Sequence, residues 1–231
     1  GWGFNTTPQA ALNNRRGYQP RGKVLGGSSS INAMVYIRGQ HADYDHWAAQ
    51  GNPGWGWEDV KPYFLRAENN ERGANDWHGR GGPFNVADLR APNRFSQYFT
   101  DAGVQAGHPH NTDFNGATQE GVGLYQVTHK NGERHSAAKG YLTPHLARPN
   151  LQVITGAHAT RILFDGMRAV GVEYRQGGAI KQVRAGREVL LSAGALLSPQ
   201  LLMLSGVGPA AHLQQHGIPV PVGKKSPYST D

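Results

Sequence analysis

The stretch with the clearest chemical potential is residues 26–32, which read GGSSSIN. Two adjacent glycines let the backbone approach a ligand closely, because no Cβ stands in the way. The three serine hydroxyls and the Asn32 carboxamide can exchange hydrogen bonds with a polar edge of that ligand. A flexible Gly/Ser linker is the alternative, but a mixed apolar run over residues 31–37 follows at once. The pattern therefore favours a ligand-contacting turn.

A second glycine-rich stretch, residues 206–211, matches the G-x-G-x-x-A pattern of dinucleotide-binding turns. That fingerprint must follow a strand and open a helix. Here residues 199–204 are themselves helical in pattern, and Pro209 follows the second glycine. We therefore predict that one helix ends at this stretch and that a new helix starts at Pro209. No G-x-G-x-x-G occurs elsewhere, so no nucleotide-binding βαβ opening is expected.

The 11 histidines raise the question of a metal site. His108 and His110 lie near Asp113, but the proline between the two histidines suits a turn and nothing nearby supplies a fourth ligand. The absence of cysteine excludes thiolate ligands and Cys nucleophiles. No G-x-S-x-G elbow is present, which disfavours a Ser-His-Asp hydrolase. His78, in the Gly-rich residues 76–83, is predicted to be a satisfied histidine of a structured turn.

Helices and loops are predicted to hold the first motif. Residues 1–25 lack periodicity and indicate an extended arm. Residues 71–92 are rich in Gly, Asn, Pro and Trp and indicate a long loop. Pro62 is expected near a helix start, where its missing N–H is harmless. The elements predicted from apolar spacing are helices at residues 43–49, 57–69 and 95–107 and a strand at 84–86.

From residue 150 the pattern changes to short β-branched runs separated by turn residues. The predicted strands, which imply a meander, are residues 151–155, 159–164, 169–174, 180–184 and 189–192. The last strand leads through the small residues 192–194 into a helix over residues 198–204. Such a turn lets backbone amides approach an anionic group. Residues 223–231 are predicted to be a frayed tail.

Composition restricts the class of protein. The chain has 231 residues, enough for one large domain or parts of two. With 38% apolar and 17% charged residues it is not a disordered polyampholyte. The 32 glycines show no three-residue period, which excludes collagen. The longest apolar run, residues 189–197, is shorter than the roughly 18 residues of a membrane span.

The net charge and the first residues of the chain bear on its binding partners and its location. The formal net charge of +7 would suit a polyanion partner. The basic residues are scattered, however, and no basic-aromatic interleaving of the kind that grips nucleic acid is present, so we expect no nucleic-acid partner. No charged-then-apolar leader is visible, and a cytoplasmic location is the default expectation. The sequence reads like a segment of a longer chain.

Two long motifs carry a resemblance to a known family. Residues 22–32, with Tyr36, Gly39 and Asp45, resemble the first signature of the glucose–methanol–choline (GMC) flavin oxidoreductases. Residues 194–208 resemble the second signature. The segments between them are similar to family connecting segments at residues 131–138 and 148–151. The general character is that of the choline and alcohol dehydrogenase branch, and only the central part of a typical member is covered.

The resemblance implies a mixed α+β and α/β fold. It contains part of an FAD/NAD(P)-binding-type fold, with its β-meander and return strand, and part of a GMC substrate domain, while the first βαβ unit is absent. Residues 1–57 would be an FAD-contacting arm with the first signature, and residues 58–149 a partial substrate or cap domain. Residues 150–208 would be the meander, return strand and second signature. Residues 209–231 would be a short helix and a disordered tail.

The same resemblance implies FAD as cofactor. The residues expected to contact it are Gly26, Gly27, Ser28, Asn32, Ala33, Val35, Ala159, Ala193 and Gly194. Some family members attach FAD through a histidine one position before the signature asparagine. Ile31 occupies that position here, so we expect noncovalent flavin. No metal is expected.

The implied reaction is oxidation of the CH–OH group of an alcohol, choline or another primary alcohol, with hydride transfer to flavin N5. The histidine that takes the hydroxyl proton in the family has no match here, so no catalytic residue is assigned, and its place is expected beyond residue 231. The chain alone is expected to be inactive and to hold FAD weakly or not at all. The alternative is a non-catalytic binding module, descended from a flavoenzyme, that self-associates through exposed former interfaces.

Overall fold

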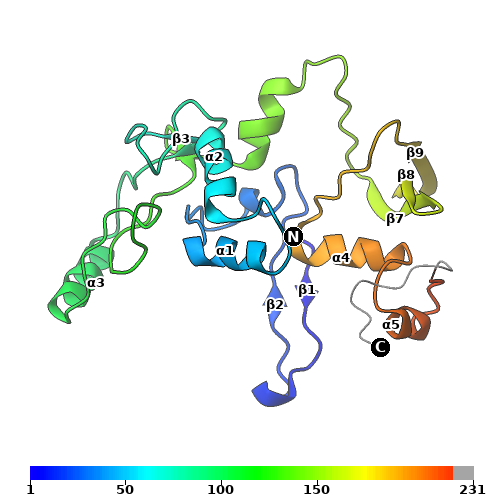
Figure 1. Cartoon of the computed structure of the whole chain (residues 1–231), viewed down its shortest axis with the longest axis horizontal. Helices are drawn as coiled ribbons and strands as arrows, with labels where there is room; N and C mark the ends of the chain where they lie inside the picture. Colours follow the sequence, from blue (N-terminus) through cyan, green and yellow to red (C-terminus); the bar gives the residue numbers. More distant parts are fainter. Residues whose placement is uncertain (221–231) are drawn as a thin grey trace. The chain divides into compact units, whose positions relative to one another are not determined.

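The computed structural model describes residues 1–220, which fall into two compact units, Gly1–Leu151 (unit 1) and Gln152–Asp231 (unit 2). Figure 1 traces the elements along the chain. The helices are α1 His41–Ala49, α2 Trp57–Ala67, α3 Arg94–Gln105, α4 Gly194–Leu204 and α5 Ala210–Gln215. The strands are β1 Phe4–Asn5, β2 Tyr18–Gln19, β3 Glu68–Asn70, β4 Phe84–Val86, β5 His129–Lys130, β6 Glu133–Arg134, β7 His158–Asp165, β8 Arg168–Gln176 and β9 Ala179–Arg184. The predicted mixture of helices and strands is confirmed.

In unit 1, α1 and α2 lie side by side and share an aromatic core (Figure 1). An acid in the first turn caps each helix. Asp43 accepts a hydrogen bond from the backbone N–H of Gln40 at 2.8 Å. Asp59 does the same for Gly56 at 3.2 Å. Trp57, the first residue of α2, is only 5% exposed and joins the two helices.

The predicted helices of unit 1 are confirmed, with changed ends. Helix α1 begins two residues before the predicted residues 43–49. Helix α2 ends before residue 69, because residues 68–70 leave the helix and form β3, which pairs in parallel with the predicted strand β4. The prediction for Pro62 was wrong, since it lies inside α2, where it leaves one carbonyl of the preceding turn without its backbone donor. The predicted arm contains the two-stranded ribbon β1–β2.

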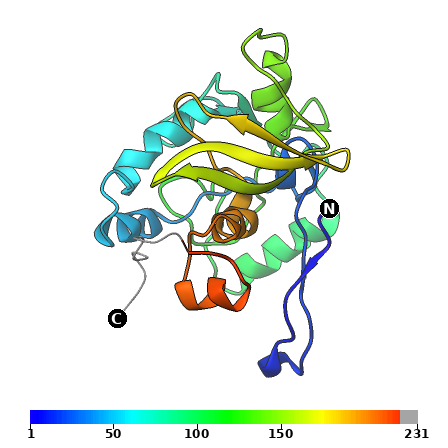
Figure 2. The ribbon, with the colours of Figure 1, turned by 90° about the vertical axis from the view of Figure 1, so that its right-hand side faces the viewer.

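Unit 2 is built on an antiparallel sheet of order β7-β8-β9 (Figure 2). These three strands confirm the predicted runs at residues 159–164, 169–174 and 180–184. The strands predicted at residues 151–155 and 189–192 are wrong, because both runs are irregular. A strand needs a neighbour to pair its backbone groups. Within residues 1–220 neither run has one, and Leu190 is 79% exposed.

Helix α4 packs against β7. It begins at Gly194, earlier than the predicted residue 198. The glycine pattern at residues 206–211 is not a dinucleotide-binding turn. Gly206 follows the end of α4, and Pro209 is the N-cap of α5, as predicted. The predicted tail, residues 223–231, lies outside the described residues. Among residues 1–220, no helix has the length and apolar character needed to cross a bilayer.

Candidate functional site

The glycines of the first motif fix an unusual backbone turn. Gly26 and Gly27 both have positive φ angles, 84° and 54°. Residues that carry a side chain rarely adopt this backbone conformation. A Cβ on Gly22 would lie 2.2 Å from the carbonyl oxygen of Gly27, so the two sides of the turn meet backbone to backbone. A Cβ on Gly27 would instead find nothing within 4 Å. The turn is therefore tight on its inner side and bare over Gly27.

The three serines of the motif fold the turn as well as lining it. Ser28 Oγ accepts a hydrogen bond from the backbone N–H of Gly22 at 3.2 Å. Ser30 Oγ donates to the carbonyl of Leu25 at 2.8 Å. Ser29 Oγ accepts from the backbone N–H of Ala137 at 2.9 Å. From the sequence we predicted that these hydroxyls contact a ligand. Their hydrogen bonds within the protein were not predicted, because they depend on contacts across the fold.

The motif continues into an exposed, largely apolar edge. Asn32 and Ala33 are exposed, and Val35 is 42% exposed although its backbone bridges to Val127. Other large apolar side chains exposed along residues 24–37 are Val24, Leu25, Ile31 and Ile37. The motif therefore offers a ligand a bare backbone turn, an apolar edge and one exposed carboxamide.

Three of the nine expected contact residues lie in unit 2, and the other six lie in unit 1. Ala159 is in β7, opposite Tyr174 of β8. Ala193 is the N-cap of α4. Gly194 has a φ of 88°, and a Cβ added to it would meet nothing within 4 Å. The start of α4 is thus bare backbone with first-turn N–H groups that have no partner within the helix, which suits an anionic group.

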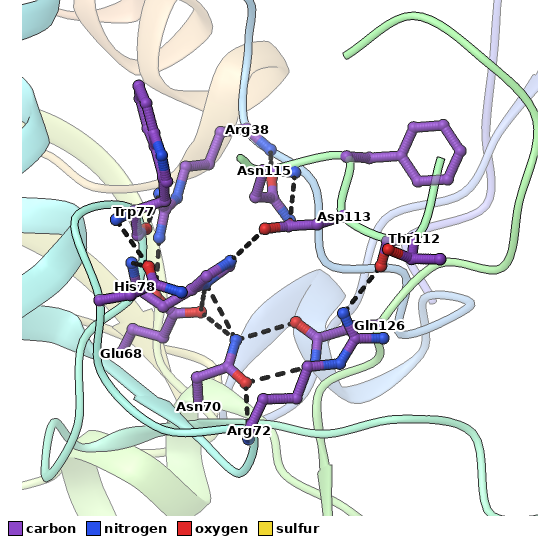
Figure 3. A network of polar contacts seen from close by, with 12 residues as sticks. Arg38, Glu68, Asn70, Arg72, Trp77, His78, Thr112, Asp113, Asn115 and Gln126 are labelled. Carbon is purple, nitrogen blue, oxygen red and sulfur yellow. Dashed lines mark hydrogen bonds and ion pairs between the residues drawn. The ribbon is translucent and has the colours of Figure 1, made fainter. Parts of the chain in front are cut away.

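A second polar centre, missed by the sequence, lies in the interior of unit 1 around Glu68, whose side chain has no exposed surface (Figure 3). Arg38 Nη2 donates to Glu68 Oε2 at 2.7 Å. The backbone N–H of Gly79 donates to the same oxygen at 3.1 Å. His78 Nδ1 and Asn70 Nδ2 lie 3.0 and 2.9 Å from Oε1. Both carboxylate oxygens are therefore filled by donors.

His78 is held between two carboxylates. Its Nδ1 faces Glu68, and its Nε2 lies 2.9 Å from Asp113 Oδ2. Burial alone would lower the pKa of His78, but hydrogen bonds to Glu68 and Asp113 outweigh burial and raise it. Burial would raise the pKa of Glu68, but hydrogen bonds from His78, Asn70 and Gly79 and the charge of Arg38 hold it low. Both ring nitrogens of His78 face carboxylate oxygens, so protonated His78 donates a hydrogen bond to each.

This charge state assigns the remaining hydrogen bonds. With both imidazole nitrogens donating, the 3.0 Å contact of Asn70 Nδ2 with His78 Nδ1 joins two donors and is not a hydrogen bond. The two amide hydrogens of Asn70 go to Glu68 and to Gln126 Oε1, the latter at 2.8 Å. Both ring nitrogens of His78 therefore have partners, which confirms the prediction that His78 is a satisfied structural histidine.

No site for a metal emerges where the sequence raised the question. Asp113, the acid of that cluster, binds His78. Within residues 1–220, no group of three His, Cys, Asp or Glu side chains is arranged to hold an ion. The interior cluster has no visible sequence signal, because its acids and amides come from segments far apart in the chain.

Comparison with known proteins identifies one family. A family model described as GMC oxidoreductase matches residues 5–226. An alcohol dehydrogenase [acceptor] of Pseudomonas putida is 51% identical over 220 residues, which cover 94% of this chain and 40% of that protein. An oxygen-dependent choline dehydrogenase of Brucella ovis is 49% identical over 217 residues, covering 94% of this chain and 39% of that protein.

Solved structures agree with the sequence relatives. Pyridoxine 4-oxidase from Mesorbium loti is similar with a TM-score of 0.87 and 33% identity, covering 94% of this chain and 43% of that one. An FAD-dependent oxidoreductase from Chaetomium thermophilum is similar with a TM-score of 0.88 and 34% identity, covering 95% of this chain and 40% of that one. The chain thus spans about two-fifths of the length of these proteins.

Proposed function

Because the chain belongs to the GMC oxidoreductase family, we propose that it is part of an FAD-dependent oxidoreductase that oxidises the CH–OH group of an alcohol, choline or another primary alcohol. The alcohol and choline dehydrogenases at about half identity support this substrate class. The chain spans about two-fifths of their length, so the activity belongs to the whole enzyme.

We further propose that Gly26, Gly27, Ser28, Asn32, Ala33, Val35, Ala159, Ala193 and Gly194 contact the cofactor. Two observations support this, because the backbone is bare at Gly27 of unit 1 and, separately, at Gly194 of unit 2. The first-turn N–H groups of α4 suit the pyrophosphate. The exposed edge at Val35 suits the apolar faces of the flavin ring. Nothing in this set calls for a covalent bond, in keeping with Ile31 at the attachment position.

When bound, FAD supplies the hydride acceptor. The residues of this chain would bind and orient it: the bare turn at Gly27 would leave room for it, and the Asn32 carboxamide would offer a polar contact. No side chain here is assigned to take the hydroxyl proton of the substrate. We therefore propose that the isolated chain is catalytically silent and holds FAD only weakly.

The bare backbone over Gly27 is the observation that carries the proposed cofactor contact at this turn. A pair of glycine variants tests it. Gly27→Ala would place a methyl in open space at a left-handed residue, costing about 1 kcal/mol of stability while blocking the cofactor. Gly22→Ala would clash with the Gly27 carbonyl and disrupt the turn itself. We expect millimolar FAD to shift the NMR signals of residues 26–33 in the wild-type chain, and these shifts to be lost in a folded Gly27→Ala variant.

Two results would contradict the proposal. Equal FAD-induced shifts in wild type and Gly27→Ala would remove the turn from the cofactor site. A yellow preparation of the isolated chain that reduces a dye with choline or a primary alcohol would show that the chain is not silent.

The second candidate is a non-catalytic module that self-associates through exposed apolar surface. Helix α3 favours it, because Phe95 and Phe99 are 77% and 76% exposed, one turn apart on the same face. A flavin spectrum separates an FAD-binding chain from such a module, and the oligomeric state tests the association.

A further inference from the structure

A single arginine holds the end of the GGSSSIN turn. Arg134 is the second residue of β6. Its Nη1 donates to Asn32 Oδ1 at 2.7 Å and to the carbonyl of Ser29 at 3.0 Å. Its Nη2 donates to the backbone carbonyl of Asn32 at 2.7 Å. The guanidinium therefore grips both the main chain and the side chain of one residue, across 102 positions of sequence.

These contacts decide which way the Asn32 carboxamide points. A guanidinium only donates hydrogen bonds, so the atom facing Arg134 must be the amide oxygen. The backbone N–H of Met34 donates to the same oxygen at 3.1 Å. Two donors fill the two lone pairs of Oδ1. Among the described residues, Asn32 Nδ2 then has no hydrogen-bond partner, and the residue is exposed.

The local backbone supports this orientation. The Met34-to-Asn32 bond spans two residues and forms a turn closed by a side chain. Met34 has a φ of 65°, an uncommon conformation for a residue with a side chain. Its carbonyl accepts from the backbone N–H of Thr128 at 2.8 Å, which holds the strained residue in place. The turn is thus fixed from both sides.

We propose that Arg134 is a positioning residue that presents Asn32 to the flavin only as a hydrogen-bond donor. The group that it meets is then an acceptor on the ring edge, a carbonyl oxygen or an unprotonated ring nitrogen. This inference rests on the proposed function and adds the direction of the hydrogen bond and the residue that sets it. Arg134 itself touches no cofactor in this arrangement, since its described contacts are with the turn.

Substitutions at two residues separate the hydrogen-bond donor, Asn32, from the residue that positions it, Arg134. Asn32→Asp keeps the shape and still accepts from Arg134 and Met34, but its outward atom becomes an acceptor. Arg134→Gln removes the bidentate grip and lets the amide rotate. Arg134→Lys keeps the charge at a single point and restores part of the grip. Arg168→Gln, at an exposed arginine of unit 2 with no described side-chain hydrogen bond, is the matched control.

The experiment follows the Asn32 side-chain NH2 signals by ¹⁵N NMR in the chain, with and without millimolar FAD. In the wild type and the control we expect one fixed pair of signals that shifts with FAD. Arg134→Gln should move or broaden this pair even without FAD, and lower the apparent FAD affinity about tenfold. Arg134→Lys should lie between, and Asn32→Asp should lose FAD as strongly as Arg134→Gln while its backbone signals keep the wild-type turn.

The outcomes distinguish the two proposals. If FAD shifts the backbone of residues 26–28 but leaves the Asn32 amide unchanged, the cofactor site stands and the donor role is overturned. Signals of Asn32 that are indifferent to Arg134→Gln in the free chain overturn the positioning role. If FAD shifts nothing at all in the folded chain, the cofactor assignment fails and this inference fails with it.

Discussion

Glu68 has a side chain without exposed surface, and each of its oxygens is met by donors. A buried carboxylate is costly unless it is paired and hydrogen-bonded, and removing one partner leaves the charge uncompensated. Arg38 and His78 supply two positive charges, and Asp113 balances the second. The interior of unit 1 is therefore held by charges whose protonation states depend on one another.

His78→Gln should destabilise the chain in a pH-dependent way. The raised pKa of His78 means that its contribution is fully present below its ordinary value of 6.5 and is lost as pH rises through the raised value. The lowered pKa of Glu68 makes its contribution fully present above 4.5 and lost at more acid pH. We expect a loss of about 3 kcal/mol at a pH between these limits, and a smaller loss in alkali.

Urea unfolding of wild type and variant at about pH 5.5 and about pH 9, on either side of the ordinary histidine pKa, measures this difference. His108→Gln, at an exposed histidine outside the network, is the control and should show no comparable pH dependence. A His78→Gln penalty that is equal at both pH values would mean that folding does not shift the pKa of His78.

At the scale of elements, β7 and α4 are joined by one hydroxyl. A register shift in β7 lies between Ala159 and Arg161, and just after it the backbone N–H of Ile162 donates to Ser205 Oγ at 2.8 Å. Ser205 Oγ in turn donates to the carbonyl of Leu201 at 2.6 Å. Ser205 thus closes the end of α4 and satisfies a buried strand donor.

Ser205→Ala should cost about 1–2 kcal/mol, because it leaves the Ile162 N–H without an acceptor at a residue that is 6% exposed. Denaturant unfolding measures the loss, and hydrogen exchange of the Ile162 amide should become faster. Ser198→Ala, inside α4 and without a described side-chain hydrogen bond, should be neutral or slightly stabilising. Equal effects of the two substitutions would contradict the role of Ser205.

At the scale of the whole molecule, much apolar surface is exposed. In unit 1 this includes Phe95 and Phe99 of α3, each more than three-quarters exposed, and in unit 2 Leu190 at 79%. Monomeric soluble proteins rarely leave large contiguous apolar patches uncovered. The exposed pair on α3 therefore fits a surface that contacts another polypeptide segment or a second molecule.

The self-association alternative predicts that the wild-type chain elutes above its monomer mass of 25.0 kDa in size-exclusion chromatography. Phe95→Gln with Phe99→Gln should then shift elution toward the monomer, since the α3 face would lose its two large apolar side chains. Met167→Gln, at a single apolar residue that is 81% exposed in the hairpin turn between β7 and β8, should change nothing. Monomeric elution of the wild type over a wide concentration range would exclude this alternative.

The accuracy of the sequence predictions follows the range of the interactions involved. Helix α3 and the meander β7–β9 follow from local periodicity and turn residues, so they could be predicted. The runs at residues 151–155 and 189–192 have the right residues for strands, but a strand also needs a partner. The opposite happened at β3. The helical pattern continues to residue 69, but pairing with β4 makes residues 68–70 a strand instead.

The sequence by itself determined the family signatures, the glycine turn and the absence of cysteine chemistry, because these depend on residue type and short spacing. Only the tertiary structure decided that Arg134 grips Asn32 and that Glu68, His78 and Asp113 share one buried network. The partners in each case lie 10 to 102 positions apart. Their meeting depends on how the chain folds back, and a hydrogen bond or a buried charge has no meaning before that packing exists.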